Sequence, residues 1–222
     1  MISIVVICHN YGRFLRKCLS SIIRADNKFV KEIIIIDDSS TDNTSVISTE
    51  FQRNYKKIFF YKKKFKSLSK STNFAISKSS GTWIAKVDAD DYVSKNFISD
   101  FVSKIKMNDK ANYICTDIIC FNEAKKIKFK IKQNFTTKTT FFKYPLGSGS
   151  LFKKKLWKTV NGFNENLYYQ DDLDFWFKIK KIKKLIYIEK ANYFYRKHGR
   201  NMSKNIIIKY LTKIYILLKN TI

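Results

Sequence analysis

The chain has 222 residues, of which 45% are hydrophobic and 16% aromatic, and this composition excludes an intrinsically disordered protein. It carries 44 Lys and Arg residues against 18 Asp and Glu, a net charge of +26 that would attract nucleic acid, anionic lipid or phosphorylated small molecules. Because residues with AT-rich codons, such as Lys, Ile and Asn, are abundant, codon bias explains part of this charge equally well.

The cysteine and apolar patterns predict a cytoplasmic protein. None of the four cysteines belongs to a C-x-x-C pair, and we expect buried thiols at Cys8, Cys18, Cys115 and Cys120. With only His9 and His198 in the chain, a Cys/His zinc site is not expected. The first residues lack the basic start of a secretory signal, and no stretch reaches the ~20 apolar residues of a membrane span.

The first half of the sequence alternates short apolar runs with segments of helical periodicity. The expected strands are Ile2–Cys8, Glu32–Ile36, Ile58–Tyr61 and Trp83–Val87. The expected helices cover Leu15–Ile23, Thr44–Arg53, Ser67–Ser79 and Ile98–Ile105. Strands that are apolar throughout and separated by helices predict a parallel sheet covered on both faces.

The second half has a different pattern. We expect antiparallel strands over Ala111–Phe121 and Lys126–Ile131, and then a loop over 133–150. Helices are expected over Leu151–Val160 and Asp171–Lys183, followed by a hairpin formed by Leu185–Ile188 and Asn192–Tyr195.

The last segment, Ile206–Leu218, is predicted to be an amphipathic helix. Its apolar face contains Ile207, Tyr210, Leu211, Ile214 and Leu218, with Lys209 and Lys213 off that face. Two interpretations are equally open. In one, the helix and the basic surface contact the anionic inner face of the cytoplasmic membrane, and in the other the helix packs on the domain.

Half of the acidic residues fall into three clusters, which a random distribution would not give. These are Asp37, Asp38 and Asp42; Asp88, Asp90 and Asp91; and Asp171, Asp172 and Asp174. The first two clusters directly follow predicted strands, and parallel sheets bind ligands at the carboxyl ends of their strands. Clustered carboxylates repel one another unless a cation lies among them, and oxygen ligands favour Mg²⁺ or Mn²⁺. An isolated D-x-D pair is also compatible with a simple polar turn.

Two of these acids have a more specific interpretation. Asp38 directly follows a buried strand, where a carboxylate can accept hydrogen bonds from a ribose or a base. Asp172 shares a predicted helical face with Phe175, Trp176 and Ile179, so desolvation should raise its pKa toward that of a general base. Asp171 and Asp174 fit acids that interact with the helix dipole.

Taken in order, these motifs resemble family 2 glycosyltransferases of the GT-A fold. The resemblance lies in the first strand with Asn10, in IIIIDDSSTDNT, in N-x-A-I-x-x-S-x-G-T-W-I-A-K-V-D-A-D-D and in GFNENLYYQDDLDFWFKI. It implies an α/β fold with a mostly parallel central sheet, flanking helices and a short antiparallel portion in the C-terminal half. It divides the chain into a GT-A domain over 1–204 and a basic amphipathic helix over 205–222. Within the domain, 1–110 would bind the nucleotide sugar and 111–204 the acceptor.

The resemblance also implies a reaction. An inverting enzyme would move a hexosyl or N-acetylhexosaminyl group from a nucleoside diphosphate sugar to an acceptor hydroxyl, with a UDP-sugar as the first expectation. The acceptor would be a cell-surface glycan or a lipid-linked oligosaccharide. The implied cofactor is Mn²⁺ or Mg²⁺, held by Asp90, Asp88 and His198. Asp172 would be the general base.

Further residues are implied by position in the motifs. The donor-binding set is Cys8, His9, Asn10, Asp38, Asn73, Asp88, Ala89 and Asp90. Arg196 and Arg200 are implied as weaker phosphate contacts, and Asp171 and Trp176 as weaker contacts on the acceptor side.

Three other functions compete with this interpretation. A phosphatase of the haloacid-dehalogenase type also places D-x-D after a strand, but it needs Thr or Val where Tyr92 stands. A nucleic-acid-binding protein would concentrate its lysines on one element, whereas here they spread from Lys17 to Lys219, so no nucleic-acid partner is expected. A catalytically inactive transferase-like scaffold is opposed only by the retained acids.

Overall fold

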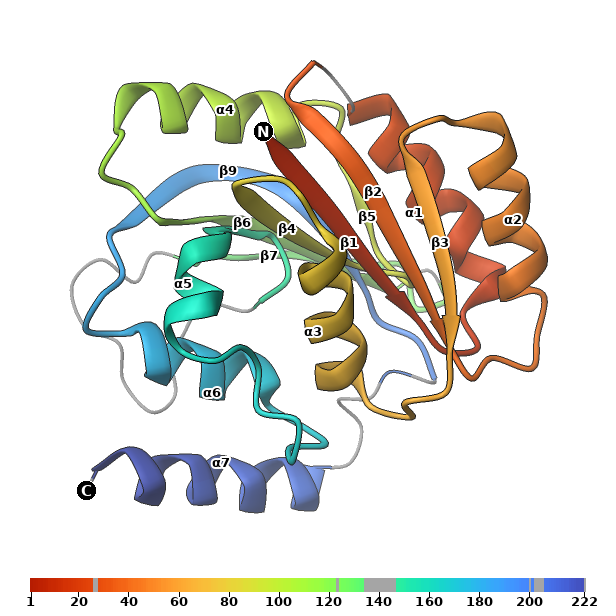
Figure 1. Ribbon diagram of the computed structural model, residues 1–222. Helices are drawn as coiled ribbons and strands as arrows, with labels where there is room; N and C mark the ends of the chain where they lie inside the picture. The colour runs from red at the N-terminus through yellow and green to blue at the C-terminus, as the bar shows by residue number, and fades with distance from the viewer. Residues whose placement is uncertain (26–27, 123, 134–146, 200, 202–205, 222) are drawn as a thin grey trace.

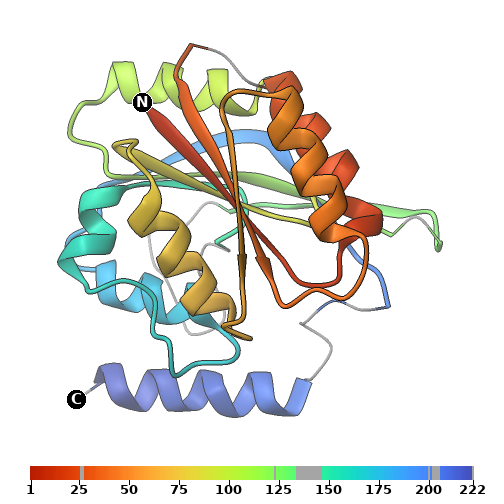
Figure 2. The ribbon, with the colours of Figure 1, turned by 45° about the vertical axis from the view of Figure 1, so that its right-hand side comes forward.

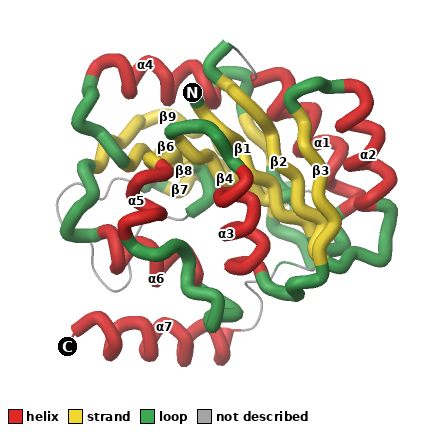
Figure 3. The backbone as a smooth tube through the Cα atoms, viewed as in Figure 1, coloured by secondary structure: helices red, strands yellow, loops and turns green. Residues whose placement is uncertain are grey.

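The structure is a computed structural model that describes residues 1–25, 28–122, 124–133, 147–199, 201 and 206–221. A nine-stranded sheet runs through its centre with helices on the outside (Figures 1 and 3). The strand order is β3 (Ile58–Lys63), β2 (Val30–Asp38), β1 (Ile2–Cys8), β4 (Trp83–Asp88), β8 (Ser150–Lys153), β6 (Tyr113–Asn122), β9 (Leu185–Arg196) and β5 (Tyr92–Val93). Strand β7 (Ile127–Ile131) pairs with β6 outside this path.

The four strands of the first half are parallel to one another. In the second half, β8 is antiparallel to both β4 and β6. Strand β7 is antiparallel to β6, and β5 is antiparallel to β9. Strands β6 and β9 are parallel. The predicted α/β fold, with a mostly parallel sheet and a short antiparallel portion in the C-terminal half, is therefore confirmed.

Helices cover both faces of the sheet, as the apolar strands require (Figure 2). One face packs against α1 (Gly12–Ala25), α2 (Thr44–Asn54) and α4 (Phe97–Met107), and the other against α3 (Leu68–Lys78), α5 (Lys154–Thr159) and α6 (Asp171–Ile179). Strand β1 shows the period of two: Ile4 and Val6 face the first core, and Val5 and Ile7 the second. Burial of each such side chain contributes about 1.5–3 kcal/mol.

The parallel pairing brings the acidic strand ends to one edge of the sheet. Cys8, at the end of β1, lies in register with Asp37 of β2, and Ile7 lies in register with Asp88 of β4. The peptide chain after each of these strands therefore leaves the sheet at the same edge, which is where parallel sheets bind their ligands.

Two predicted elements of the second half are wrong. The segment predicted as a hairpin is the single strand β9, because its polar pair Glu189–Lys190 forms an irregularity instead of a turn. Along β6 the partner shifts from Ile188 to Ala191 between neighbouring residues, so the polar pair is pushed out and the strand continues. The helix predicted from Leu151 begins only at Lys154, because Ser150–Lys153 is the strand that joins β4 to β6.

Helix α7 (Ile206–Thr221) lies against α6 at the side of the molecule toward which β1, β2 and β3 point (Figures 1 and 2). The predicted helix is thus present. Over the described residues, no helix combines the length and the apolar character needed to cross a bilayer.

Candidate active site

A cleft of about 510 Å³ opens at the edge where the parallel strands end. Two of the three predicted acidic clusters meet in it: Asp88, Ala89 and Asp90 from the end of β4, and Asp171 and Asp172 from the start of α6. The clusters are about 80 residues apart in sequence, and the sheet and helix packing bring them together. The other polar residues that line the cleft include Lys86, Ser148, Gln170, Lys197 and Asn201.

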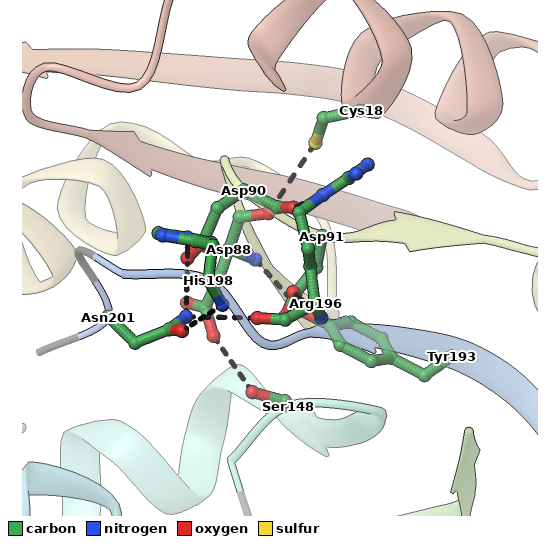
Figure 4. Close-up of polar contacts among 9 residues, drawn as sticks. All are labelled: Cys18, Asp88, Asp90, Asp91, Ser148, Tyr193, Arg196, His198 and Asn201. Atoms are coloured by element: carbon green, nitrogen blue, oxygen red, sulfur yellow. Dashed lines mark hydrogen bonds and ion pairs between the residues drawn. The ribbon is translucent and has the colours of Figure 1, made fainter. Parts of the chain in front are cut away.

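Asp88 and Asp90 are held by different partners (Figure 4). The Ser148 hydroxyl donates to Asp88 Oδ2 at 2.8 Å. His198 Nε2 lies 3.0 Å from Asp90 Oδ2, and the Asn201 amide donates to the same oxygen at 3.3 Å. Asp88 therefore faces the 147–148 segment and Asp90 faces the segment after β9.

Asp91 points away from the cleft and supports the turn. Its carboxylate accepts hydrogen bonds from the Tyr193 hydroxyl and from the Arg196 amide, both at 2.8 Å. Burial, together with the charges of Asp90 and Asp88, raises the pKa of Asp91 well above its ordinary value. The Asp91 amide in turn donates to the Asp88 carbonyl at 3.0 Å, which closes the turn. Asp91 thus fixes the backbone that presents the other two acids.

Asp172 is a carboxylate of the cleft with a raised pKa. Burial, together with the negative charge of Asp171, raises its pKa to about 6, while the positive charge of Lys86 opposes the rise. The Gly147 amide donates to one oxygen at 3.3 Å and the Leu173 amide to the other at 2.8 Å. Asp172 is partly buried and borders the cleft, and its pKa is shifted in the direction predicted from the apolar helical face.

Lys86 joins the two acidic clusters. Its Nζ lies 3.6 Å from Asp88 Oδ1 and 3.7 Å from Asp171 Oδ2, and the residue is buried. Burial alone would lower the pKa of Lys86, but the charges of Asp171 and Asp88 reverse this and the net shift is upward. The ammonium group therefore stays charged and offsets part of the repulsion between carboxylates in the cleft.

The loops after β1 and β2 form a network beside the cleft. The Asp38 carboxylate accepts hydrogen bonds from the Lys66 and Ser67 amides and from the Ser71 hydroxyl, at 2.8–2.9 Å. Asn10 accepts from the Thr41 amide at 2.8 Å, and its own backbone has a positive φ of 57°. Asp38 and Asn10 thus order the loops that follow β1, β2 and β3.

Cys8 is the last residue of β1, and His9 follows it. Cys8 is fully buried against Thr44, and burial raises the pKa of its thiol to about 12. His9 Nδ1 lies 2.6 Å from the Asp38 carbonyl oxygen. Neither residue borders the cleft, so any contact between Cys8 and a donor would involve its backbone.

Three predicted site residues lie elsewhere. Asn73 is bonded to Trp157, Phe163 and Glu165 in a separate groove between α3 and the segment after α5. Trp176 lies in the core against Tyr113, because it faces the sheet and not the cleft. Arg196 is also buried, and Arg200 is outside the described residues.

Arg196 holds the turn from inside the protein. Its Nε donates to the Asp90 carbonyl at 2.9 Å, and its guanidinium lies 4.8 Å from the Phe14 ring centre and 5.0 Å from that of Phe121. The Asp90 carbonyl and the two aromatic rings therefore occupy the guanidinium that a phosphate would need to contact. The geometry therefore favours a positioning role for Arg196.

Replacing this cation should cost stability. We expect Arg196→Met to lower the free energy of unfolding by ~2–4 kcal/mol, because it removes a charge-assisted hydrogen bond and the cation–π contacts with Phe14 and Phe121. Urea unfolding measures this directly. Unchanged stability, combined with weaker nucleotide binding, would instead support the predicted phosphate contact.

The family model "Glycosyl transferase family 2" matches residues 3–157, which include both loops of the network and the D-x-D turn. The chain belongs to glycosyl transferase family 2. Among curated relatives, glycosyltransferase GlyA of Streptococcus pneumoniae is 27% identical over 78% of this chain and 22% of its own length. An uncharacterized glycosyltransferase of Mycoplasma pneumoniae is 28% identical over 91% of this chain and 71% of its own length.

Solved structures show that this family 2 chain has the GT-A glycosyltransferase fold. S. aureus TarS 1-349 in complex with UDP-GlcNAc superimposes with a TM-score of 0.77 at 20% identity, covering 91% of this chain and 60% of TarS. The mannosyltransferase PcManGT of Pyrobaculum calidifontis, in complex with GDP-Man and Mn²⁺, gives 0.70 at 14% identity, covering 96% of this chain and 64% of PcManGT. The chain thus spans about 60% of these structures and only about a fifth of GlyA.

The family implies a divalent metal, and the residues of the cleft fit one in part. Asp90 and His198 converge within 3.0 Å and present oxygen and imidazole donors, which suit Mn²⁺. Across the described residues, no group of three or more Asp, Glu, His or Cys side chains comes together in a way that could hold a metal. Asp88 contacts Ser148 and Lys86, whereas Asp90 and His198 contact each other.

Lys86, Ser148 and Asn201 are absent from the residues predicted for this family 2 site. Lys86 could have been found, because it precedes Asp88 by two residues and strand alternation therefore places both side chains on the same side. Ser148 and Asn201 lie in irregular segments, where no periodicity indicates which side chains point toward the cleft.

Proposed function

We propose that this family 2 protein is an inverting glycosyltransferase that uses a nucleoside diphosphate sugar. One observation carries the proposal: a carboxylate with a pKa of about 6, Asp172, shares a cleft with the D-x-D pair Asp88 and Asp90. A base and a leaving-group site on one cleft are what direct displacement at a sugar carbon requires.

Each cleft residue has a proposed task. Asp172 accepts the proton of the acceptor hydroxyl as its oxygen attacks the anomeric carbon and the bond to the diphosphate breaks. Lys86 balances the carboxylates, and Asp88 and Asp90 position the donor. Asp90 and His198 would hold a divalent metal, which when bound neutralises charge on the departing diphosphate. Lys197, which borders the cleft, replaces the buried Arg196 as our proposed phosphate contact.

We further propose a UDP-sugar as donor and a hexosyl or N-acetylhexosaminyl group as the transferred sugar. The complex of TarS with UDP-GlcNAc supports a uridine nucleotide, and the GDP-Man complex of PcManGT makes a guanosine nucleotide the alternative to compare. The proposed acceptor is a hydroxyl of a cell-surface glycan or lipid-linked oligosaccharide.

The stereochemistry of the product tests the reaction type. The protein is incubated with Mn²⁺ and α-linked UDP-sugars, and proton NMR at early times reads the anomer of the sugar that is transferred or released to water. We expect the β-anomer to form first, because a single displacement inverts the carbon. Initial formation of the α-anomer would contradict the role of Asp172 as base.

The transfer rate should depend on pH with an acid limb. Asp172 acts only when ionised, and its pKa of about 6 means that protonation removes the base as the pH falls. We expect the rate to be constant above pH ~7 and about tenfold below the plateau at pH ~5. Initial rates from pH 5 to 8, with donor saturating throughout, measure this. A flat profile across that range would contradict the assignment.

A further inference from the structure

Helix α7 packs on the protein through only one of its sides. Ile216 is fully buried against Leu167, Leu173 and the partly buried Phe177. On the other side an outer strip is exposed to between 37% and 63%; it consists of Tyr210, Leu211, Ile214, Tyr215 and Leu218. Four of these five residues belong to the apolar face predicted from the sequence; the fifth residue of that predicted face, Ile207, lies outside the described side chains. The helix therefore packs on the domain and also presents an uncovered apolar surface.

The order of side chains around α7 matches a bilayer surface. At about 100° per residue, Leu211, Ile214 and Leu218 form the centre of the strip, and Tyr210 and Tyr215 lie about 70° to either side. Lys213 and Lys219 follow beyond the two tyrosines, at roughly 110–130° from the centre. Apolar side chains enter the acyl region, tyrosines stay at headgroup level, and lysines reach the phosphates.

The position of α7 adds charge complementarity. Helices α6 and α7 end on the same side of the molecule, and α6 is followed at once by Lys180, Lys181, Lys183 and Lys184 (Figures 1 and 2). Ile216 faces α6, so the outer strip, centred about 170° away, points away from the body of the protein. A chain with a net charge of +26 would be attracted to anionic lipid before the strip inserts.

We propose that the outer strip of α7 docks this protein on an anionic membrane surface. In this orientation the bilayer faces the side of the molecule toward which the parallel strands point. The cleft lies at the same side, where these strands end. A membrane-anchored acceptor would then lie within reach of Asp172, and this last step alone rests on the proposed function. The docking is independent of the transfer reaction.

Co-sedimentation with vesicles tests the docking. The protein is mixed with sucrose-loaded vesicles of phosphatidylcholine, with or without about one-third phosphatidylglycerol. We expect it to sediment with the anionic vesicles, and Leu211→Glu with Leu218→Glu to weaken this binding about tenfold or more. Leu211→Asn with Leu218→Asn should show a loss in the same direction, since it removes apolar surface without adding repulsion.

The matched control places the same charges on exposed apolar residues elsewhere. Val46 on α2 is 69% exposed and Met107 on α4 is 74% exposed, and both helices lie away from α7. Val46→Glu with Met107→Glu should bind anionic vesicles like the wild type. Circular dichroism and nucleotide-induced thermal stabilisation should be the same in all variants, which separates docking from folding and from donor binding.

Several outcomes would overturn the proposal. One is wild-type protein that stays in the supernatant with every vesicle, and another is binding of the outer-strip variants that equals binding of the control. Light scattering that shows a dimer of the wild type, dissociated by the outer-strip substitutions and without vesicle binding, would identify a second copy of the chain as the occupant of the strip.

Discussion

Asp172→Asn is expected to lower the rate of sugar transfer by ~10²–10⁴, the usual contribution of a positioned general base. The substitution keeps the shape of the side chain and one oxygen that can accept from the Gly147 or the Leu173 amide, but it removes the group that accepts the proton. Nucleotide binding should be unaffected, because we propose that it depends on Asp88 and Asp90 at the other side of the cleft. The loss should therefore appear in kcat and not in the affinity for the donor.

Asp174→Asn provides the matched control on the same helix. Asp174 is paired with Lys178 at 3.0 Å and does not border the cleft, so its loss changes the charge of α6 equally without touching the reaction. We expect Asp174→Asn to transfer at nearly the wild-type rate, with some loss of stability. Equal rates for wild type and Asp172→Asn would show that another group takes the proton.

Asp90→Asn is expected to abolish metal-dependent donor binding, with affinity falling at least ~100-fold, since even the partners of metal ligands contribute 10–100-fold. Asp90 borders the cleft and meets His198 and Asn201, and an amide would keep both neighbours while losing the charge that attracts the cation. Calorimetric titration of the nucleotide with and without Mn²⁺ measures the change.

Asp109→Asn is a suitable control for Asp90→Asn, because Asp109 is an exposed acid in the segment after α4. It should bind the nucleotide like the wild type. If Asp90→Asn retained Mn²⁺-dependent binding, the metal would have to be held elsewhere, and the pairing of Asp90 with His198 would be structural.

The sequence was most informative where one local pattern decides the outcome. Continuous β-branched runs such as Ile33–Ile36 are typical of a strand that is buried on both faces, and the observed β2 is such a strand. Parallel strands have their carboxyl ends at one edge of the sheet, so the position of Asp88 and Asp90 at that edge follows from the topology. The raised pKa of Asp172 follows equally from its apolar helical face.

Prediction was weaker wherever distant packing decides a side chain's direction. Glu189–Lys190 has the composition of a turn, but pairing with β6 keeps the chain extended and expels the two residues. Arg196 has the chemistry of a phosphate ligand, yet its guanidinium packs on Phe14 and Phe121, which both lie more than 70 residues earlier in the chain. The same holds for Asn73 on α3, whose side-chain amide forms hydrogen bonds with Trp157 on α5 and with Phe163 beyond it. Local patterns contain no information about such partners.

Calorimetric titration of the wild type with UDP, GDP and their sugar conjugates tests the central claim most directly. The claim is that the cleft between Asp88–Asp90 and Asp171–Asp172 binds a nucleoside diphosphate sugar together with a divalent metal. We predict saturable binding of one nucleotide class that requires Mn²⁺ or Mg²⁺ and is lost in Asp90→Asn. Absence of binding for every nucleotide, or binding that is unaffected by metal and by Asp90→Asn, would contradict it.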